Sequence, residues 1–156
     1  MIATGRDAAA LAALGADAMI VLGPNGAALE AAFAAEVRAG VDVVLDYLWG
    51  DSARALLVAA AKTLDDGVPL RFVQIGSVTG GEVALPAAVL RSAAICLMGS
   101  GLGSVSRPDL MGSIGALLAA AGPAGLSVAT RTVPLGAVAE AWAAEHSRVR
   151  TVLTMG

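Results

Sequence analysis

The stretch VDVVLDYLWGDSARALLVAAAKTLDDGVPLRFVQIG, residues 41–76, decides the fold. It begins with an apolar run over 41–48, interrupted only by two aspartates, which predicts a buried β-strand. The alanine- and leucine-rich stretch over 53–64 predicts an α-helix, and a second apolar run over 70–75 predicts another strand. A strand, a helix and a strand in this order predict a parallel β–α–β unit.

The same alternation extends in both directions along the chain. Further strands are predicted at 1–4, 18–22, 93–98, 126–132 and 149–154, and further helices at 6–14, 27–38, 107–121 and 135–146. The helix over 53–64 is expected to be capped by Asp51 or Ser52. Apolar strands that alternate with helices predict an α/β fold, in which a mainly parallel sheet is buried between helices on either side.

Composition excludes several classes of protein. The chain has 156 residues, which fits one domain with a single core. Its net charge is −3 and its basic residues are scattered singly, so it lacks the clustered Lys and Arg of a nucleic-acid surface. Cys96 is the only cysteine, so neither an intrachain disulfide nor a cysteine-based zinc site can form, and a reducing compartment is expected.

The mean hydropathy of +0.77 raises the question of a membrane span. The longest uncharged stretch, 110–129, is about as long as a bilayer-spanning helix, roughly 20 residues. A Gly-Pro-Ala-Gly sequence over 122–125 interrupts it, which predicts a helix followed by a strand and no span. No basic segment followed by an apolar core opens the chain, so no secretory signal is predicted and a cytoplasmic location is expected.

Glycine and small hydroxyl residues follow two predicted strands. In open parallel sheets, ligands bind beyond the carboxyl ends of the strands, which is where Gly76-Ser77 and Gly99-Ser100 lie. A glycine there lets the backbone approach a nucleotide closely and donate an unhindered N–H. The alternative is that each pair forms an ordinary turn.

The tip of the first predicted strand, Thr4-Gly5-Arg6, indicates which nicotinamide cofactor would suit the chain. A fold selective for NAD places Asp or Glu at this point to bind the ribose 2′-hydroxyl, whereas the 2′-phosphate of NADP needs an arginine and no acid. Arg6 therefore favours NADP, although Asp7 follows it. The alternative is that Arg6 is an ordinary solvated residue at the start of a helix.

No catalytic group is predicted. His146 is the only histidine, and its place near a helix end is typical of a solvated residue. Asp42 and Asp46 lie on one face of a strand but at its opposite ends, so they do not form an acid–base pair. The aromatic residues Tyr47 and Trp49, like the tryptophan at 142, fit a packing role as well as a ligand contact. No metal ligands are predicted.

Several stretches carry a family resemblance, which covers nearly the whole chain. They are MIATGRD (1–7), LGADA (14–18), GVDVVLD (40–46), VQIGS (73–77), the helix Leu135–Ala143 and the strand Val149–Leu153. Their order resembles the cofactor-binding half of the zinc-independent, quinone oxidoreductase-like members of the medium-chain dehydrogenase/reductase superfamily. This resemblance implies a Rossmann-like, doubly wound, mainly parallel sheet over 1–156, a single partial dinucleotide-binding domain.

The resemblance also implies a cofactor and a reaction. NADP(H) would pass hydride to a quinone, an enone or a related small carbonyl substrate. The resemblance assigns Gly5 and Arg6 to the 2′-phosphate, Gly23 and Pro24 to the adenine side, Gly76, Ser77 and Val78 to the nicotinamide ribose, and Gly99 and Ser100 to the nicotinamide. It further implies a homodimer that forms through the edge strand Ala94–Met98.

The chain departs from the family at its N-terminal side, where the first strand of the fold and its glycine-rich turn have no counterpart. In the strand order 3-2-1-4-5-6 that strand is central, so a gap is expected between the strands of Ile2 and Val43. The sheet would close directly, swap with a neighbour, or receive the segment from another polypeptide. We therefore expect a truncated domain that, alone, binds cofactor weakly or not at all and shows no turnover.

Two other functions stay open at this point. The first is a non-catalytic Rossmann-like module for oligomerisation or interaction, because an open sheet edge invites pairing. The second is another nucleotide-dependent α/β enzyme, such as a methyltransferase. That enzyme would need a glycine-rich loop and an acid after its second strand, and the sequence shows neither.

Overall fold

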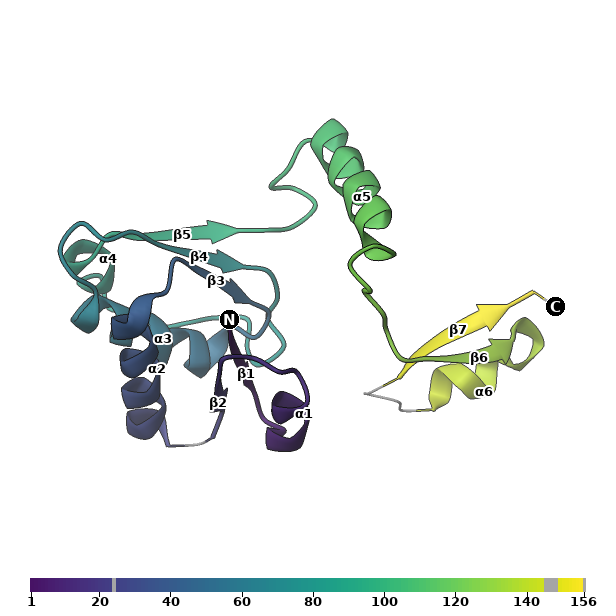
Figure 1. Cartoon of the computed structure of the whole chain (residues 1–156), viewed down its shortest axis with the longest axis horizontal. Helices are drawn as coiled ribbons and strands as arrows, with labels where there is room; N and C mark the ends of the chain where they lie inside the picture. The colour runs from purple at the N-terminus through teal and green to yellow at the C-terminus, as the bar shows by residue number, and fades with distance from the viewer. Residues whose placement is uncertain (24, 145–148, 156) are drawn as a thin grey trace. The chain divides into compact units, whose positions relative to one another are not determined.

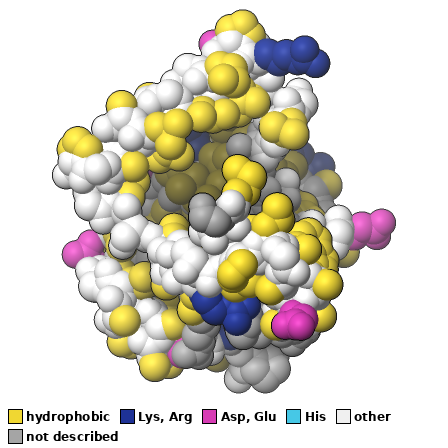
Figure 2. Space-filling view, turned by 90° about the vertical axis from the view of Figure 1, so that its right-hand side faces the viewer, with side chains coloured by type: hydrophobic (Ala, Val, Ile, Leu, Met, Phe, Trp, Pro, Cys, Tyr) yellow, Lys and Arg dark blue, Asp and Glu magenta, His cyan; other side chains and the backbone are white. Residues whose placement is uncertain are grey.

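The computed structural model describes residues 1–23, 25–144 and 149–155. The chain forms two compact units, Met1–Val105 and Ser106–Gly156, and each is treated by itself. Both units are built from parallel strands and helices (Figure 1). Hydrophobic side chains fill the core of the first unit and are also spread over the molecular face in Figure 2.

The first unit contains two separate parallel sheets. One pairs β1 with β2, and the other has the order β3-β4-β5. Their registers place Ile2 opposite Ala18 and Leu70 opposite Ile95. The elements are β1 (Ile2–Gly5), α1 (Ala8–Ala12), β2 (Ala18–Val21), α2 (Gly26–Gly40), β3 (Val43–Asp46), α3 (Gly50–Thr63), β4 (Leu70–Gln74), α4 (Val89–Ser92) and β5 (Ile95–Gly99).

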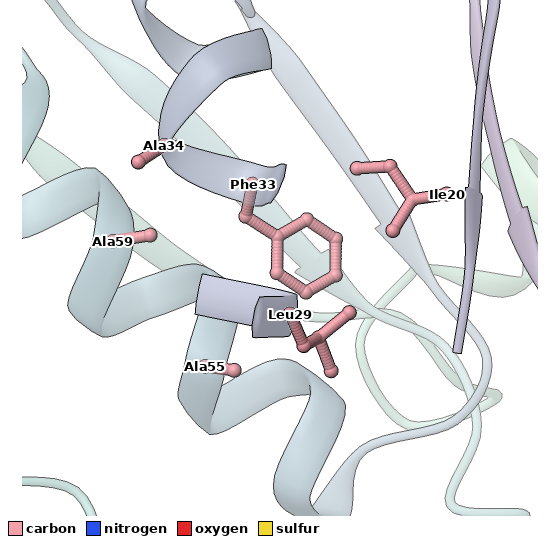
Figure 3. Packing of buried hydrophobic residues seen from close by; sticks show 6 residues of the cluster. All are labelled: Ile20, Leu29, Phe33, Ala34, Ala55 and Ala59. Atoms are coloured by element: carbon pink, nitrogen blue, oxygen red, sulfur yellow. The ribbon is translucent and has the colours of Figure 1, made fainter. Parts of the chain in front are cut away.

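Helices α2 and α3 pack side by side and join the two sheets. α2 begins after Asn25, whose side chain accepts the N–H of Ala28 at 3.1 Å. Figure 3 shows Phe33 of α2 turned towards Ile20 of β2, with small residues where the two helices meet. The buried cluster consists of Ile20, Leu29, Phe33, Ala34, Ala55 and Ala59. Alanines at the contact let the helix backbones approach closely.

A second part of the core lies between α3 and the β3-β4-β5 sheet. Leu57, Leu70 and Phe72 are fully buried, and the ring of Trp49 meets that of Phe72 edge-on at 6.3 Å. Arg71 lies between two buried residues of β4 and is exposed, so the helices cover one face of this sheet.

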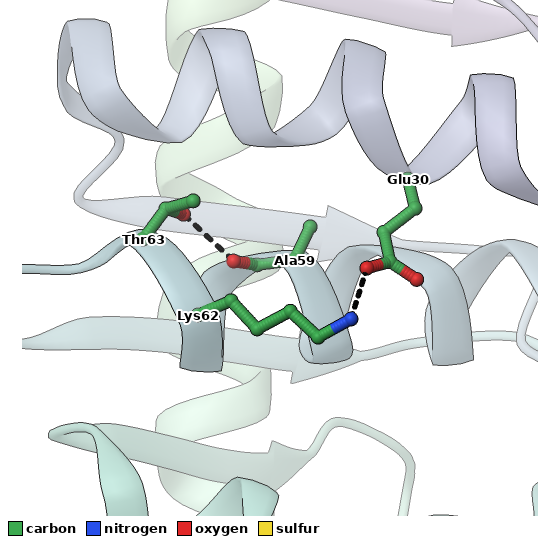
Figure 4. A network of polar contacts seen from close by, with 4 residues as sticks. All are labelled: Glu30, Ala59, Lys62 and Thr63. Carbon is green, nitrogen blue, oxygen red and sulfur yellow. Dashed lines mark hydrogen bonds and ion pairs between the residues drawn. The ribbon is translucent and has the colours of Figure 1, made fainter.

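The exposed side of the helix pair carries an ion pair. Lys62 of α3 bonds to Glu30 of α2 at 2.5 Å, next to the bond from the Thr63 hydroxyl to the carbonyl of Ala59 (Figure 4). Both charged side chains are partly or largely exposed, so the pair adds little to stability.

The second unit has one long helix and a two-stranded parallel sheet. The helix begins after Ser106, whose hydroxyl accepts the N–H of Asp109 at 3.2 Å. Among the described residues of this unit, none is buried. Its elements are α5 (Arg107–Ala121), β6 (Thr130–Pro134), the 3₁₀ turn η1 (Leu135–Ala137), α6 (Val138–Ala143) and β7 (Arg150–Thr154).

The predicted α/β class is confirmed, since parallel sheets flanked by helices are consistent with a Rossmann-like fold. The expected gap is also present, because β1 and β3 belong to different sheets. The prediction of one domain over 1–156 stays a prediction.

Several boundaries differ from the predictions. The predicted cap of α3 was wrong: the helix begins at Gly50, so Asp51 lies within its first turn, and Trp49 precedes it without a side-chain cap bond. The strand predicted at 126–132 begins later, at Thr130, where it pairs with β7. The helix predicted at 135–146 is a 3₁₀ turn followed by α6, which ends at Ala143. Position 146 lies outside the described residues.

Candidate functional site

Two loops at the carboxyl end of the β3-β4-β5 sheet are joined by backbone hydrogen bonds. One loop follows β3 and the other follows β4. The N–H of Gly76 donates to the carbonyl of Asp46 at 3.2 Å, that of Val78 to Tyr47 at 3.3 Å, and that of Thr79 to Leu48 at 2.9 Å. The two loops therefore form one continuous layer at the end of the sheet.

Glycine is required at two points where these loops touch. A Cβ on Gly76 would lie 2.7 Å from the carbonyl oxygen of Tyr47. Gly50 has a φ of +63°, and a Cβ there would lie 2.9 Å from the Thr79 hydroxyl. That hydroxyl donates to the carbonyls of Leu48 at 3.0 Å and Trp49 at 3.1 Å. Contact between the loops is thus one physical reason for Gly76, besides the approach of a ligand.

Asp46 organises the turn after β3. It is the buried charged residue at the end of this strand, and its carboxylate accepts the N–H groups of Leu48 at 3.1 Å and Trp49 at 3.0 Å. These bonds hold Trp49 at a φ of 60°, where non-glycine residues are uncommon. The carboxylate therefore has a structural task.

The structure brings together the residues that the resemblance assigns to the nicotinamide side. The N–H of Ser100 donates to the carbonyl of Gln74 at 2.8 Å, and the Gln74 side-chain amide donates to the carbonyl of Gly76 at 2.9 Å. Gly99 ends β5 and is exposed. Ser77 and Val78 are exposed as well. A surface of backbone and small side chains therefore spans the carboxyl ends of β4 and β5.

Gly5 and Arg6 lie at the carboxyl end of β1, on the other sheet. The carbonyl of Gly5 accepts the N–H of Leu22 at 2.8 Å, and a Cβ on Gly5 would lie 3.3 Å from the Leu11 side chain. Arg6 is exposed, and within the described parts of the chain no hydrogen bond or ion pair is found for its guanidinium. The Asp7 carboxylate accepts the N–H of Ala10 as the N-cap of α1.

Gly23 borders a shallow apolar cleft beside the end of β2. The cleft has a volume of about 270 Å³. Its wall includes Val21, Asn25, Ala28 and Leu29. Pro24, which was predicted beside Gly23, lies outside the described residues. The predicted site residues thus fall into two groups, one on each sheet of the first unit.

Metal-binding and membrane-spanning features were searched in the described parts of the chain. No group of three or more His, Cys, Asp or Glu residues is placed to hold a metal ion there, and Cys96 is exposed. No helix in those parts is both long and apolar enough to cross a bilayer.

Sequence reasoning missed the structural roles of three residues that build the site. Gln74 links the ends of β4 and β5, Thr79 closes over the turn after β3, and Trp49 adopts a positive φ. The two carbonyls that accept the Thr79 hydroxyl belong to residues 31 and 30 positions earlier in the chain. No local sequence pattern could have identified that contact.

The comparisons with known proteins include a curated relative and solved structures. No family model matches the chain. A protein of Emericella nidulans described as a probable NADPH-dependent quinone reductase, tdiC, is 31% identical over 116 residues, which span 69% of this chain and 32% of that protein. This chain therefore spans about a third of the length of the curated relative that it matches.

One of the solved structures that the chain resembles is the crystal structure of AibC. The match covers 98% of this chain and 42% of the AibC chain, with a TM-score of 0.65 and 22% sequence identity. This match shows a similar fold. The chain is thus similar over part of its length to an oxidoreductase, and it shares its fold with part of a longer chain.

Proposed function

We propose that the chain is the cofactor-binding portion of an NADP(H)-dependent, zinc-independent oxidoreductase of the medium-chain type. Its substrate would be a quinone, an enone or a related small carbonyl compound. The observation that carries this proposal is the similarity to a probable NADPH-dependent quinone reductase, at 31% identity over 69% of the chain. A cytoplasmic location belongs to the same proposal.

The residues at the end of β1 suit a 2′-phosphate. Arg6 is exposed and offers its guanidinium donors at the carboxyl end of a parallel strand. The next residue, Asp7, accepts the N–H of Ala10 as the N-cap of α1. The apolar cleft of about 270 Å³ beside Gly23 would receive the flat adenine ring.

The loops at the ends of β4 and β5 would hold the other half of the cofactor. Gly76, Ser77 and Val78 would approach the nicotinamide ribose, while Gly99 and Ser100 would lie at the nicotinamide. When bound, the nicotinamide supplies the hydride. The protein's task is then to orient the nicotinamide ring. The two loops that are hydrogen-bonded to each other at Gly76 would provide a fixed surface for that orientation.

The open edge of β5 favours a second candidate function, an oligomerisation module. β5 pairs with β4 on one side, and no described strand pairs with its other side. An open edge can pair with the same edge of a second copy. We propose a homodimer through this edge, which is compatible with the cofactor function.

The test uses half-cofactors, because they need neither a pyrophosphate loop nor a substrate. Binding of 2′,5′-ADP and of 5′-AMP would be followed by amide chemical shifts in the isotope-labelled chain. We expect 2′,5′-ADP to shift the amides of Gly5, Arg6 and Gly23 and to bind about tenfold more tightly than 5′-AMP.

The control separates Arg6 from general positive charge. Arg6→Ala should abolish the preference for 2′,5′-ADP, whereas Arg91→Ala, at an exposed arginine of α4, should retain it. Equal binding of both nucleotides to the unaltered chain would contradict the NADP assignment. Shifts confined to other amides would contradict the site.

A further inference from the structure

Gln74, the last residue of β4, places a side-chain amide at the carboxyl end of the sheet. It is the only glutamine of the sequence, and Asn25 is the only asparagine. β4 is the middle strand of its sheet, with β3 on one side and β5 on the other. Gln74 therefore lies where the loops that follow these strands come together.

Two hydrogen bonds of Gln74 join the loops proposed for the nicotinamide half of the cofactor. Its backbone carbonyl accepts the N–H of Ser100 at 2.8 Å. Its side-chain nitrogen donates to the carbonyl of Gly76 at 2.9 Å. The amide thus lies between the residues proposed for the nicotinamide ribose and those proposed for the nicotinamide ring.

The bond to Gly76 also fixes which end of the Gln74 amide is the nitrogen. A carbonyl oxygen only accepts hydrogen bonds, so the group that meets the Gly76 carbonyl must be the NH₂ group. That bond uses one of the two N–H groups. In the described parts of the chain, no partner is found for the other N–H or for the side-chain oxygen.

The free edge of this amide is open to a ligand. Gln74 is half-buried. Over the described residues, the enclosed side-chain nitrogen or oxygen that lacks a partner is the Nε of Arg131, so the unpaired oxygen of Gln74 is not enclosed. The amide therefore presents one acceptor and one donor side by side.

A nicotinamide ring carries a complementary group. Its carboxamide also has an N–H donor beside a carbonyl acceptor, and two amides can pair through two hydrogen bonds. A nicotinic acid ring has a carboxylate in that place. A carboxylate only accepts hydrogen bonds, so one of its oxygens would face the oxygen of Gln74 without a proton between them.

The other polar side chains of these loops cannot make this distinction. Ser77 and Ser100 are exposed, and a hydroxyl group both donates and accepts, so it suits a carboxamide and a carboxylate alike. The Thr79 hydroxyl and the Asp46 carboxylate are bonded within the turn after β3. Selection between the two rings therefore falls to the amide.

We propose that Gln74 determines which pyridine ring the site accepts, by pairing its side-chain amide with the carboxamide of nicotinamide and rejecting the carboxylate of nicotinic acid. This inference rests on the cofactor-binding function proposed above and adds the residue that reads the ring. The bond to Gly76 holds the amide in place before the ring binds, so pairing costs little side-chain entropy.

The test uses three dinucleotides that differ only at one position of the pyridine ring. They are NADP⁺, its nicotinic acid analogue and its 3-acetylpyridine analogue. The last keeps the carbonyl group and the charge of NADP⁺ but has no N–H to donate. All three share the adenosine half, whose binding raises the local concentration of the ring at Gln74.

Side-chain NH₂ signals in the isotope-labelled chain report on the two halves of each probe separately. Asn25 lines the cleft proposed for adenine, so its NH₂ signal should shift equally with all three dinucleotides. NADP⁺ should in addition shift the NH₂ signal of Gln74 and the amide of Gly76. We expect NADP⁺ to bind about tenfold more tightly than the acetylpyridine analogue, and the nicotinic acid analogue to bind no better than the latter.

Two variants separate direct pairing from support of the loop. Gln74→Met has a side chain of similar length without polar hydrogen-bonding groups of an amide, and it should lose the preference for NADP⁺ over the acetylpyridine analogue. Gln74→Glu loses the donor to Gly76 but keeps an acceptor for the carboxamide, so it should retain most of that preference. Arg71→Gln, at an exposed residue of the same strand, is the control and should keep it.

The preference is a ratio of two affinities measured on one variant. A loosened loop that weakens both dinucleotides alike therefore leaves it unchanged. Equal binding of NADP⁺ and the acetylpyridine analogue to the unaltered chain would overturn the proposal. It is also overturned if Gln74→Met keeps the preference, or if Gln74→Glu loses it as completely as Gln74→Met, since Gln74 would then act only through Gly76.

The Asn25 signal distinguishes this failure from failure of the cofactor proposal. If Asn25 and the amides of Gly5 and Gly23 shift while Gln74 shows no selectivity, the cofactor proposal stands and the role of Gln74 is refuted. If none of the three dinucleotides shifts Asn25, Gly5 or Gly23, the cofactor proposal fails and the role of Gln74 fails with it.

Discussion

The two units of the chain contain similar elements, but among the residues that the structure describes only the first unit buries side chains. In Met1–Val105, Leu57 of α3 is fully buried in the core cluster that contains Phe72. In α5 of the second unit, Leu118 is 71% exposed. Both helices are 14 or 15 residues long and rich in alanine and leucine. Most helical stability in proteins comes from the packing of an apolar face, so we expect α3 to be held chiefly by the core and α5 to depend more on its local signals.

The largest expected difference between the units comes from their apolar side chains. Phe72→Ala removes a fully buried ring and should lower the free energy of unfolding by about 3–5 kcal/mol. Leu118→Ala should change it by no more than about 0.5 kcal/mol. Urea unfolding followed by far-UV circular dichroism would measure both. Comparable losses would show that α5 buries its leucines against a surface of its own.

The next difference concerns glycine. Gly76→Ala would press a methyl group on the Tyr47 carbonyl and should cost about 1–3 kcal/mol. Gly115→Ala places the same methyl group in open space within α5 and should stabilise that helix by about 0.5–1 kcal/mol. Thermal unfolding of the two variants would give opposite shifts. Destabilisation by both would mean that α5 is packed at Gly115.

The cap of α5 provides a smaller test of its dependence on local signals. Ser106→Ala removes the acceptor for the N–H of Asp109 and should destabilise the helix by about 1 kcal/mol. Amide exchange in the first turns of α5 should become faster, while exchange in α3 stays unchanged. Ser127→Ala, outside any helix or strand, is the matched control. Unchanged exchange in α5 would show that contacts other than the cap hold it.

The smallest expected effect comes from the surface of the first unit. A hydrogen bond from the Met1 ammonium, followed by its charge, lowers the pKa of Asp17 in the folded chain. The stabilisation is therefore present above the unfolded pKa of about 3.9 and is lost as pH falls through the lower folded pKa. Both groups are exposed, so the contribution is slight.

Asp17→Asn should accordingly be less stable than the unaltered chain near pH 7 and equal to it at about pH 2. Urea unfolding across this pH range would measure the difference, with Asp66→Asn as the control. A difference that grows as the pH falls would contradict the assigned cause.

Sequence-based prediction succeeded where local signals mark an element and failed where contacts in the core fix it. The helix Arg107–Ala121 was predicted with its observed bounds, because Ser106, Pro108 and Gly122 mark its ends locally. The short helix Val89–Ser92 was not predicted, since it is a single turn held by the burial of Val89 in the core. The start of α3 was misjudged because Asp46 and Thr79 fix the turn before it.

The candidate site could be predicted only in part for the same reason. The positions after the strands were found, because parallel strands place their carboxyl ends predictably. The contact of Gly76 with Tyr47 and the bridge from Gln74 to Gly76 depend on how two loops fold over one another. Local periodicity carries no information about that contact.

The pairing of α2 with α3 has a consequence for how the first unit unfolds. Its two sheets belong to separate hydrogen-bonded ladders, so one can influence the other chiefly through the small residues where these helices meet. The unit will therefore melt cooperatively only while that contact persists. Bulkier side chains at Ala55 or Ala59 would separate one transition into two, with each sheet behaving as its own foldon.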